Sequence, residues 1–159
     1  MIESPALESA FICPLTPLDP LPRLTAGLPG CGGQLRAFVE DFQVDEIALY
    51  EPAGAGDHLN LWIEKIDVAA DTLRRHVARS LHIPTMDVGM AGLKDRRAVT
   101  RQWVSVPRAC EPRLDRVTTD RIRVLDVRAH RNKLRTGHLA GNRFRIRLRA
   151  TVPEAAGRA

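Results

Sequence analysis

Cysteine is scarce in this sequence, and the cysteines present form no recognisable pattern. Cys13, Cys31 and Cys110 are odd in number and widely spaced, without the CxxC pairs or histidine partners of a zinc site. The five histidines likewise form no closely spaced metal-binding pair. We therefore expect no metal centre and no disulfide framework, and we interpret the thiols as buried or incidental groups in a reducing compartment.

Long apolar runs are also lacking. No segment approaches the roughly 18 consecutive apolar residues that a membrane-spanning helix needs. The N-terminus, MIESPALESAF, has early acidic residues and no basic stretch followed by an apolar core, so it does not resemble a secretory signal. At 159 residues the chain fits one domain with an ordinary core, and we expect a cytoplasmic protein with no membrane partner.

Lysine is also scarce. The chain has 24 basic residues, and only Lys65, Lys94 and Lys133 among them are lysines. The charge is segregated: residues 1–95 hold 7 basic and 14 acidic side chains, a net of −7, and residues 96–159 hold 17 and 5, a net of +12. Arginine suits bidentate phosphate contacts and stacking on bases, which favours a nucleic-acid partner. The alternative is an arginine-rich composition that gives only a soluble basic face.

The order of local patterns indicates how the chain is organised. Residues 1–33 are rich in proline and glycine and are expected to form an extended lead-in, followed by a domain over 34–150 and a tail over 151–159. Within the domain, alternating apolar and polar residues predict strands over 42–47 and 59–64. The glycine-rich turn between these two strands would join them into a hairpin.

A helix and further strands are predicted downstream. Asp71 is the expected N-cap of a helix that runs to about Leu81, with an apolar residue recurring every fourth position on its buried face. Alternation continues over 100–106, and again over 121–127, where a phase change after Val124 is typical of a β-bulge.

The last predicted strand, residues 143–149, has the clearest alternation. Phe144, Ile146 and Leu148 would face the core, and the arginines between them would form the opposite face. That arginine face suits either a groove for a polyanion or a solvated edge. Mostly strands with one main helix between them predict an α+β fold with a mixed or antiparallel sheet.

The stretch VGMAGLKDRRAVTRQWVS, residues 88–105, is the candidate for chemistry. Asp95 lies between Lys94 and the pair Arg96 and Arg97. It should stay ionised at neutral pH, because its neighbours favour the charged form, so it is interpreted as a nucleophile or a fixed anion. The alternative is a solvated turn. It lies between a short apolar run punctuated by Gly89 and Gly92 and the predicted strand over 100–106. This position favours the functional interpretation, since a loop between two strand candidates often carries chemistry.

Four blocks of the sequence resemble the TruD family of tRNA pseudouridine synthases. In family order they are LRAFVEDFQVDEI, LYEPAGAGDHLNLWIEK, AGLKDRRAVTRQW and KLRTGHLAGNRFRIRLR, between Gln34 and Arg149. The KD pair followed by AVTxQW is the most distinctive of them. The resemblance implies a partial pseudouridine synthase catalytic fold, tRNA as partner, isomerisation of a uridine in the D-stem region, and no cofactor or metal.

The resemblance also implies roles for individual residues. Asp95 falls at the family's catalytic aspartate, which attacks the target nucleotide so that the uracil is released, rotates and rejoins the ribose through C5. A flipped-out uridine would be held in the pocket. The expected substrate-binding residues are Arg36, Phe42, Lys94, Arg97, Asn142 and Phe144. Arg36 falls where the family usually has a lysine, a basic residue able to pair with the aspartate or with phosphate. From periodicity alone, both phenylalanines are equally well explained as core and the asparagine as a turn residue.

The resemblance stops before the family pattern is complete. Family members are roughly twice this length and carry a second half with an NYFGxQRFG motif, so this chain is expected to be a fragment, a truncated product or one half of a split enzyme, with a missing C-terminal half or second chain as partner. The alternative is a non-catalytic RNA-binding module. A metal-dependent nuclease is disfavoured because clustered carboxylates are lacking.

Overall fold

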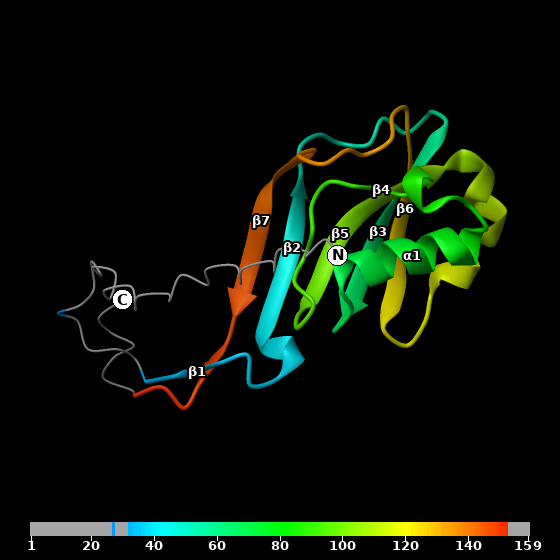
Figure 1. Cartoon of the computed structure of the whole chain (residues 1–159). Helices are drawn as coiled ribbons and strands as arrows, with labels where there is room; N and C mark the ends of the chain where they lie inside the picture. Colours follow the sequence, from blue (N-terminus) through cyan, green and yellow to red (C-terminus); the bar gives the residue numbers. More distant parts are fainter. Residues whose placement is uncertain (1–26, 28–31, 153–159) are drawn as a thin grey trace, which may run out of the picture. The chain divides into compact units, whose positions relative to one another are not determined.

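We describe a computed structural model of the chain at residue 27 and residues 32–152 (Figure 1). The chain divides into two units, residues 1–30 and 31–159, and all the described helices and strands belong to the second. The predicted lead-in and tail, with Cys13 and Cys31, therefore fall almost wholly outside the described residues. Cys110 is a buried free thiol, and burial raises its pKa.

The main sheet is mixed, as expected, and its strand order is β6-β3-β5-β2-β7. Its neighbouring strands are antiparallel except for β2 and β5, which are parallel. A short β4 (Gly89–Met90) pairs with β5, and β1 (Gln34–Leu35) pairs with β8 (Leu148–Arg149) in a separate two-stranded ribbon. The five long strands are β2 (Phe42–Ala48), β3 (His58–Ile66), β5 (Val99–Pro107), β6 (Ile122–His130) and β7 (Leu139–Ile146).

The predicted hairpin between β2 and β3 is wrong, because β5 lies between these two strands (Figure 1). β5 is buried at most positions and pairs with β2 on one side and β3 on the other, as befits a central strand. The glycine-rich connection does not turn back on β2. Instead its residues reach β6, where the Gly54 amide donates to the Ala129 carbonyl oxygen at 3.0 Å.

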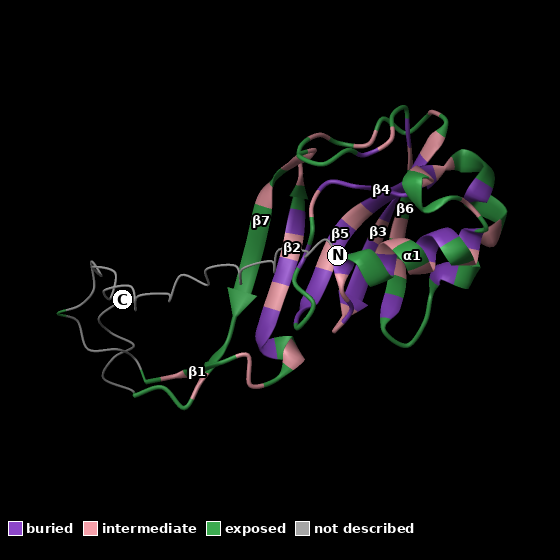
Figure 2. Cartoon of the chain, in the orientation of Figure 1, coloured by how far each residue is buried: buried purple, intermediate pink, exposed green. Residues whose placement is uncertain are grey.

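Helix α1 (Ala70–Leu81) covers one face of the sheet and closes the main core (Figure 2). Leu73, Val77 and Leu81 are fully buried, as the period of the sequence predicts. Each such side chain contributes about 1.5–3 kcal/mol relative to an exposed one. Asp71 is not the N-cap: Ala69 occupies that position without a side-chain hydrogen bond, and the Asp71 carboxylate pairs with Arg75 at 2.6 Å.

Short 3-10 segments complete the fold. The third of them packs against α1, where His76 Nε2 lies 2.8 Å from the Val117 carbonyl oxygen. The histidine thus has a packing role, as expected for a residue on a helix side. The three segments are Val39–Asp41, Thr85–Asp87 and Arg108–Val117.

The bulge predicted in β6 is confirmed. In the pairing with β3, Trp62 lies opposite Asp126 whereas Ile63 lies opposite Val124, so Leu125 is the extra residue. The last predicted strand, in contrast, breaks at Arg147, whose amide donates to the Asp41 carbonyl oxygen at 2.8 Å. β7 ends before this residue and β8 begins after it.

The apolar face of β7 is not the core face that alternation predicts. Phe144 is 54% exposed and Ile146 is 48% exposed. β7 is an edge strand that pairs only with β2 within the main sheet, and α1 covers the other end of that sheet (Figure 2). Periodicity identifies the two faces of a strand, but it does not say which of them is covered.

Candidate active site

The loop between β4 and β5, residues 91–98, carries Asp95 and is fixed to β2 by a buried ion pair. Lys94 Nζ lies 2.5 Å from Glu46 Oε2, and both side chains are almost fully buried. The other carboxylate oxygen of Glu46 accepts the Trp103 amide at 3.2 Å. Lys94, expected to bind substrate, is therefore occupied within the protein and directed away from the solvent.

A second buried lysine fixes the backbone of the loop. Lys65, at the end of β3, is fully buried and donates from Nζ to the carbonyl oxygen of Asp95 at 2.7 Å. Burial lowers the pKa of Lys65 from 10.5 to about 8, and the nearby charge of Asp95 opposes this shift. Lys65 thus fixes the backbone of Asp95 itself, and Lys94 fixes the residue before it. Together they restrict the positions that the Asp95 carboxylate can reach.

The carboxylate of Asp95 itself remains accessible, with 46% of the side chain exposed. Its ion-pair partner is Arg36, whose Nη2 lies 3.5 Å from Oδ1. Position in the sequence pointed to the adjacent cations, but Lys94 pairs with Glu46 and Arg96 Nε lies 3.6 Å from Asp67. Arg36 is the residue for which the family resemblance implied a pairing with the aspartate or with phosphate. The cation beside the carboxylate therefore comes from a distant segment of the chain.

Arg36 also contacts an aromatic ring of the site. Its guanidinium carbon lies 3.8 Å from the centroid of the Phe42 ring, a cation–π contact. Arg36 adopts a left-handed conformation with φ of 55°, which is unfavourable for a residue with a side chain. Three of the expected site residues, Asp95, Arg36 and Phe42, are therefore brought together by measured contacts.

A buried carboxylate holds the segment that contains Arg36. Asp41 accepts two hydrogen bonds from Arg149, at 2.7 Å and 2.8 Å, and one from the Phe38 amide at 3.0 Å. The hydrogen bonds from Arg149 have the largest effect on the pKa of Asp41, and with the bond from the Phe38 amide they lower it, although burial acts to raise it. The Asp41–Arg149 hydrogen bonds connect the chain before β2 to the chain after β7. The pairing of β1 with β8 joins the same two segments.

The remaining expected residues lie on β7 or on the loop. Register places Val44 opposite Phe144 and Glu46 opposite Asn142, so Asn142 and Phe144 share the face of the sheet that carries Phe42. The Phe42 and Phe144 rings meet edge to face with centroids 6.0 Å apart. Asn142 is an exposed strand residue, so the turn interpretation is wrong.

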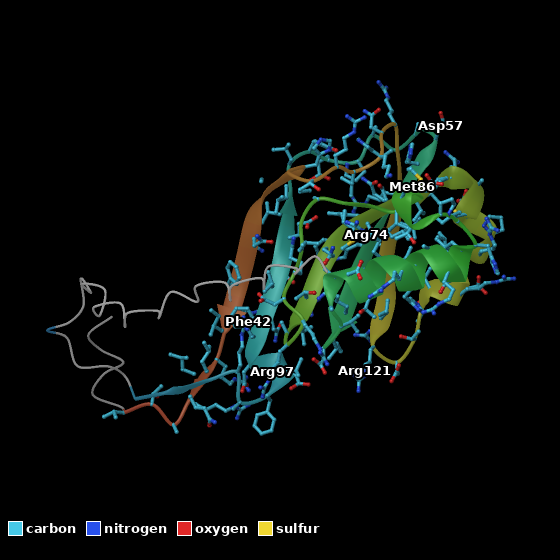
Figure 3. All side chains as sticks on the ribbon, in the orientation of Figure 1. Phe42, Asp57, Arg74, Met86, Arg97 and Arg121 are labelled. Atoms are coloured by element: carbon cyan, nitrogen blue, oxygen red, sulfur yellow. The ribbon has the colours of Figure 1, made fainter. Side chains whose placement is uncertain are left out.

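The two phenylalanines differ in burial. Phe42 is 8% exposed and packs with Val44 and Ala98, as a core residue would, whereas Phe144 is half exposed. Arg97 is exposed on the loop and, among the described residues, forms no ion pair with a carboxylate. Figure 3 shows Arg97 and Phe42 toward the same end of the sheet. The site thus offers an anchored carboxylate, two aromatic rings and exposed guanidiniums.

Sequence reasoning missed the residues that support Asp95, above all Lys65 and Glu46. Both occupy the buried phase of an alternating strand, Lys65 after Leu61 and Ile63, and Glu46 after Val44. A charged residue in the buried phase is rare because an unpaired charge is costly to bury. That signal was present in the sequence, but the partners of the two residues could not be read from it.

No other chemistry is evident in the described part of the chain. Within it, no group of three or more His, Cys, Asp or Glu side chains is placed to hold a metal ion. None of the helices described there is both long and apolar enough to cross a membrane.

Comparisons with known proteins identify the family. The model of the family "tRNA pseudouridine synthase D (TruD)" matches residues 22–159. A tRNA pseudouridine synthase D of Geobacter metallireducens is 50% identical over 136 residues, covering 86% of this chain and 34% of the relative. One from Thermus thermophilus is 46% identical, covering 80% of this chain and 36% of the relative.

A solved structure supports the same assignment. The crystal structure from Methanosarcina mazei assigned to tRNA pseudouridine synthase D (TruD) matches with a TM-score of 0.71 and 33% identity, covering 77% of this chain and 28% of that one. The chain thus spans about a third of the length of the curated relatives it matches, so they are longer than the sequence led us to expect. The chain belongs to the tRNA pseudouridine synthase D (TruD) family.

Proposed function

We propose that this chain carries the aspartate-bearing part of an enzyme that isomerises a uridine of tRNA to pseudouridine, with Asp95 as the nucleophile. One observation carries the proposal: the Asp95 carboxylate is accessible while its backbone is fixed by Lys65. A nucleophile needs this combination, because it must meet the substrate at a defined position. The tRNA substrate comes from the names of the relatives, and a cytoplasmic location stays a prediction.

The proposed reaction needs no redox partner. A carboxylate oxygen of Asp95 forms a bond to C1′ of the ribose, and the glycosidic bond breaks with its electron pair going to N1 of uracil. The released uracil anion rotates and C5 attacks C1′, which returns the electron pair to the carboxylate. The proton leaves C5 and N1 gains one, so the product is an isomer of the substrate. The Arg36 guanidinium stabilises the carboxylate both before and after this exchange.

The aromatic residues supply a surface for the extruded base. Phe144 is half exposed beside the buried Phe42, and it offers a ring on which uracil can stack. Asn142, two residues before it on the same face, has an exposed amide that can hydrogen-bond to the edge of the base. Arg97 is free to contact the phosphate backbone.

We further propose that polypeptide outside these residues completes the uridine site, either in the same chain or as a second chain. The open apolar face of β7 supports this, since exposed apolar surface next to a site commonly receives another segment. The isolated chain is then expected to be weakly active or inactive. A second candidate function, a non-catalytic RNA-binding module, is favoured by the net charge of +12 over residues 96–159.

The test places the chain in a complete context. Residues 34–149 replace the matching part of the Geobacter metallireducens relative, and release of tritium from C5-labelled uridine in tRNA is measured. We expect release by the chimera, and a loss of about 10⁴-fold in Asp95→Asn because the nucleophile is removed at constant shape. Binding of tRNA should stay within about twofold.

The matched control is Asp120→Asn, which makes the same chemical change at an exposed position. It should leave tritium release unchanged. If Asp95→Asn releases tritium as fast as the parent chimera, Asp95 is not the nucleophile. If the parent chimera binds tRNA but releases no tritium, the non-catalytic module is the better description.

A further inference from the structure

A hollow of about 690 Å³ lies at the end of β2 away from Asp95. We call it the distal pocket, and Tyr50, His130, His138, Arg131 and Arg135 are prominent in its lining. Its size is that of a site for a nucleotide-sized ligand. None of the residues expected from the sequence to act on uridine lines it.

The charge of the distal pocket suits an anion. Arg131 and Arg135 are exposed, and neither forms an ion pair with a carboxylate of the described residues. Lys133 is a third cation in the lining, with its ammonium group against the Met86 carbonyl oxygen. The acidic residue in the lining, Glu51, is 89% exposed and lies 3.7 Å from Arg128.

The aromatic wall of the distal pocket is already ordered. The Tyr50 ring stacks on His130 with centroids 5.1 Å apart and 13° between planes, and the Tyr50 hydroxyl lies 2.9 Å from His138 Nδ1. The Ala53 amide donates to His130 Nδ1 at 3.1 Å, so a neutral His130 carries its proton on Nε2 and can donate from there. A preformed wall of this kind reduces the entropy lost on binding.

A glycine is required to bring the connecting loop against this wall. Gly56 has φ of +133°, and a Cβ placed there would clash with the His130 carbonyl oxygen. The Gly54 amide and the Ala53 amide both bind the C-terminal end of β6 from the same loop. The β2–β3 connection therefore forms one side of the distal pocket, with Tyr50 and Glu51 in the lining.

We propose that the distal pocket binds phosphate groups of the tRNA strand away from the target uridine, through Arg131, Lys133 and Arg135. The inference rests on the proposed function for the identity of the ligand as tRNA. Arg36 and Phe42 mark one end of β2 and Tyr50 follows its other end, and seven strand residues span about 20 Å. In Figure 3, Phe42 and Arg97 lie toward one end of the sheet, and Asp57 and Met86 lie toward the other.

This distance sets the length of RNA that can reach both sites. One strand of double-helical DNA carries a phosphate about every 3.4 Å along its axis, and with a similar spacing in a stacked RNA strand about 20 Å corresponds to roughly six nucleotides. The distal pocket would thus contact the strand several nucleotides from the uridine at Asp95. It would orient the tRNA and contribute to affinity without taking part in the reaction.

The first experiment measures tRNA binding by fluorescence polarisation at several salt concentrations. The full chain is compared with Arg131→Gln/Arg135→Gln and with a matched control, Arg75→Gln/Arg79→Gln, on the exposed side of α1. Each lost phosphate contact should reduce the slope of log affinity against log salt by about 1, so we expect a reduction of about 2 for the pocket variant only. Equal reductions in the two variants would overturn the proposal. All four positions are on the surface, and a thermal melt confirms that each variant folds.

The second experiment uses single-stranded RNAs of increasing length centred on the target uridine. The parent chain should gain affinity when the arm exceeds roughly six nucleotides, and Arg131→Gln/Arg135→Gln should not. A variant that loses affinity equally for the shortest and longest RNAs contradicts the assignment. Competition by UMP at the distal pocket, with no effect of the variant on tRNA, would identify a free-nucleotide site and also overturn it.

The two proposals fail in different ways. If Asp95→Asn abolishes tritium release but the pocket variant leaves the salt slope and length dependence unchanged, only the distal pocket is refuted. If tRNA binding shows the expected slope and length effects but Asp95 proves dispensable, only the catalytic proposal is refuted.

Discussion

Beneath α1, aliphatic side chains of β3, β5 and β6 form the larger buried cluster, whereas β2 and the loop over it bury a smaller apolar cluster together with an ion pair. We call these regions the α1 half and the β2 half. The first contains Leu61, Leu73 and Val104, all fully buried. The second contains the Lys94–Glu46 pair.

The difference separates stability from chemistry. Aliphatic packing stabilises the fold through contacts that have no preferred direction, and it tolerates little rearrangement. Buried charges are costly, and we interpret them as groups kept where a defined geometry is needed. Two buried lysines lead to the loop of Asp95: Lys94 through its pair with Glu46, and Lys65, on β3, through its hydrogen bond. The buried carboxylates of Asp41 and Glu64 pair with arginines elsewhere. Variants in the two halves should therefore have different signatures.

The largest expected loss of stability comes from breaking the buried pair. Lys94→Met leaves Glu46 charged and unpaired, and should lower the free energy of unfolding by about 3–5 kcal/mol. Urea denaturation measures this loss. The double variant Lys94→Met/Glu46→Gln should recover part of it, because the uncompensated charge is gone.

An exposed pair gives the control for that experiment. Arg75→Met breaks the pair with Asp71, in which both side chains are about two-thirds exposed, and should cost less than about 0.5 kcal/mol. Equal losses for Lys94→Met and Arg75→Met would show that the buried pair has no special role.

In the α1 half, Leu73→Ala should lower the free energy of unfolding by about 3 kcal/mol, because it removes a fully buried side chain and leaves a cavity. Ile146→Ala on β7 changes a side chain that is 48% exposed and should cost less than about 1 kcal/mol. Thermal melts of the two variants compare the halves directly. A larger loss for Ile146→Ala would mean that the face of β7 is covered in solution.

The pH dependence of stability tests Lys65. Its pKa in the folded chain, about 8, lies below the 10.5 of an unperturbed lysine, so between these values the unfolded chain binds more protons. Stability contributed by this group therefore rises as pH increases from about 8 to about 10.5, by about 3 kcal/mol in total.

Lys65→Met should remove that rise, since no group at this position then releases a proton. The measurement is the difference in free energy of unfolding between the parent chain and the variant at pH 7, 8, 9 and 10. The free energy of unfolding of the parent chain should rise relative to that of the variant with each step in pH. A constant difference would mean that Lys65 keeps an ordinary pKa in spite of its burial.

Sequence reasoning succeeded where a pattern is local. The period of α1, the alternation of β2, β3 and β5, and the bulge at Leu125 follow from side-chain spacing alone. The resemblance led to the family and to Asp95 as the candidate nucleophile. These features do not depend on which segments meet in space.

It failed where the answer depends on long-range pairing. The hairpin was predicted because β2 and β3 are adjacent in sequence, but β5 is inserted between them. Sequence position suggested the neighbours of Asp95 as its cationic partners, and only the family resemblance pointed to Arg36, which approaches from 59 positions away along the chain. Likewise the partners of Lys65 and Glu46 lie on other elements, so their roles required the folded structure.

The smallest expected change in stability concerns Phe144, where the β2 half opens to solvent. Phe144→Ala removes a ring that is 54% exposed, so the free energy of unfolding should change by less than about 1 kcal/mol. In the active chimera, loss of one stacking surface should lower kcat/KM by about tenfold or more, since base stacking contributes about 1–3 kcal/mol. Ile146→Ala, on the same face and similarly exposed, removes apolar surface without removing a ring, and it should lower kcat/KM clearly less than Phe144→Ala does. Equal activity losses in the two variants would assign the effect to the β7 surface as a whole, and the specific role of Phe144 in holding uracil would have to be given up.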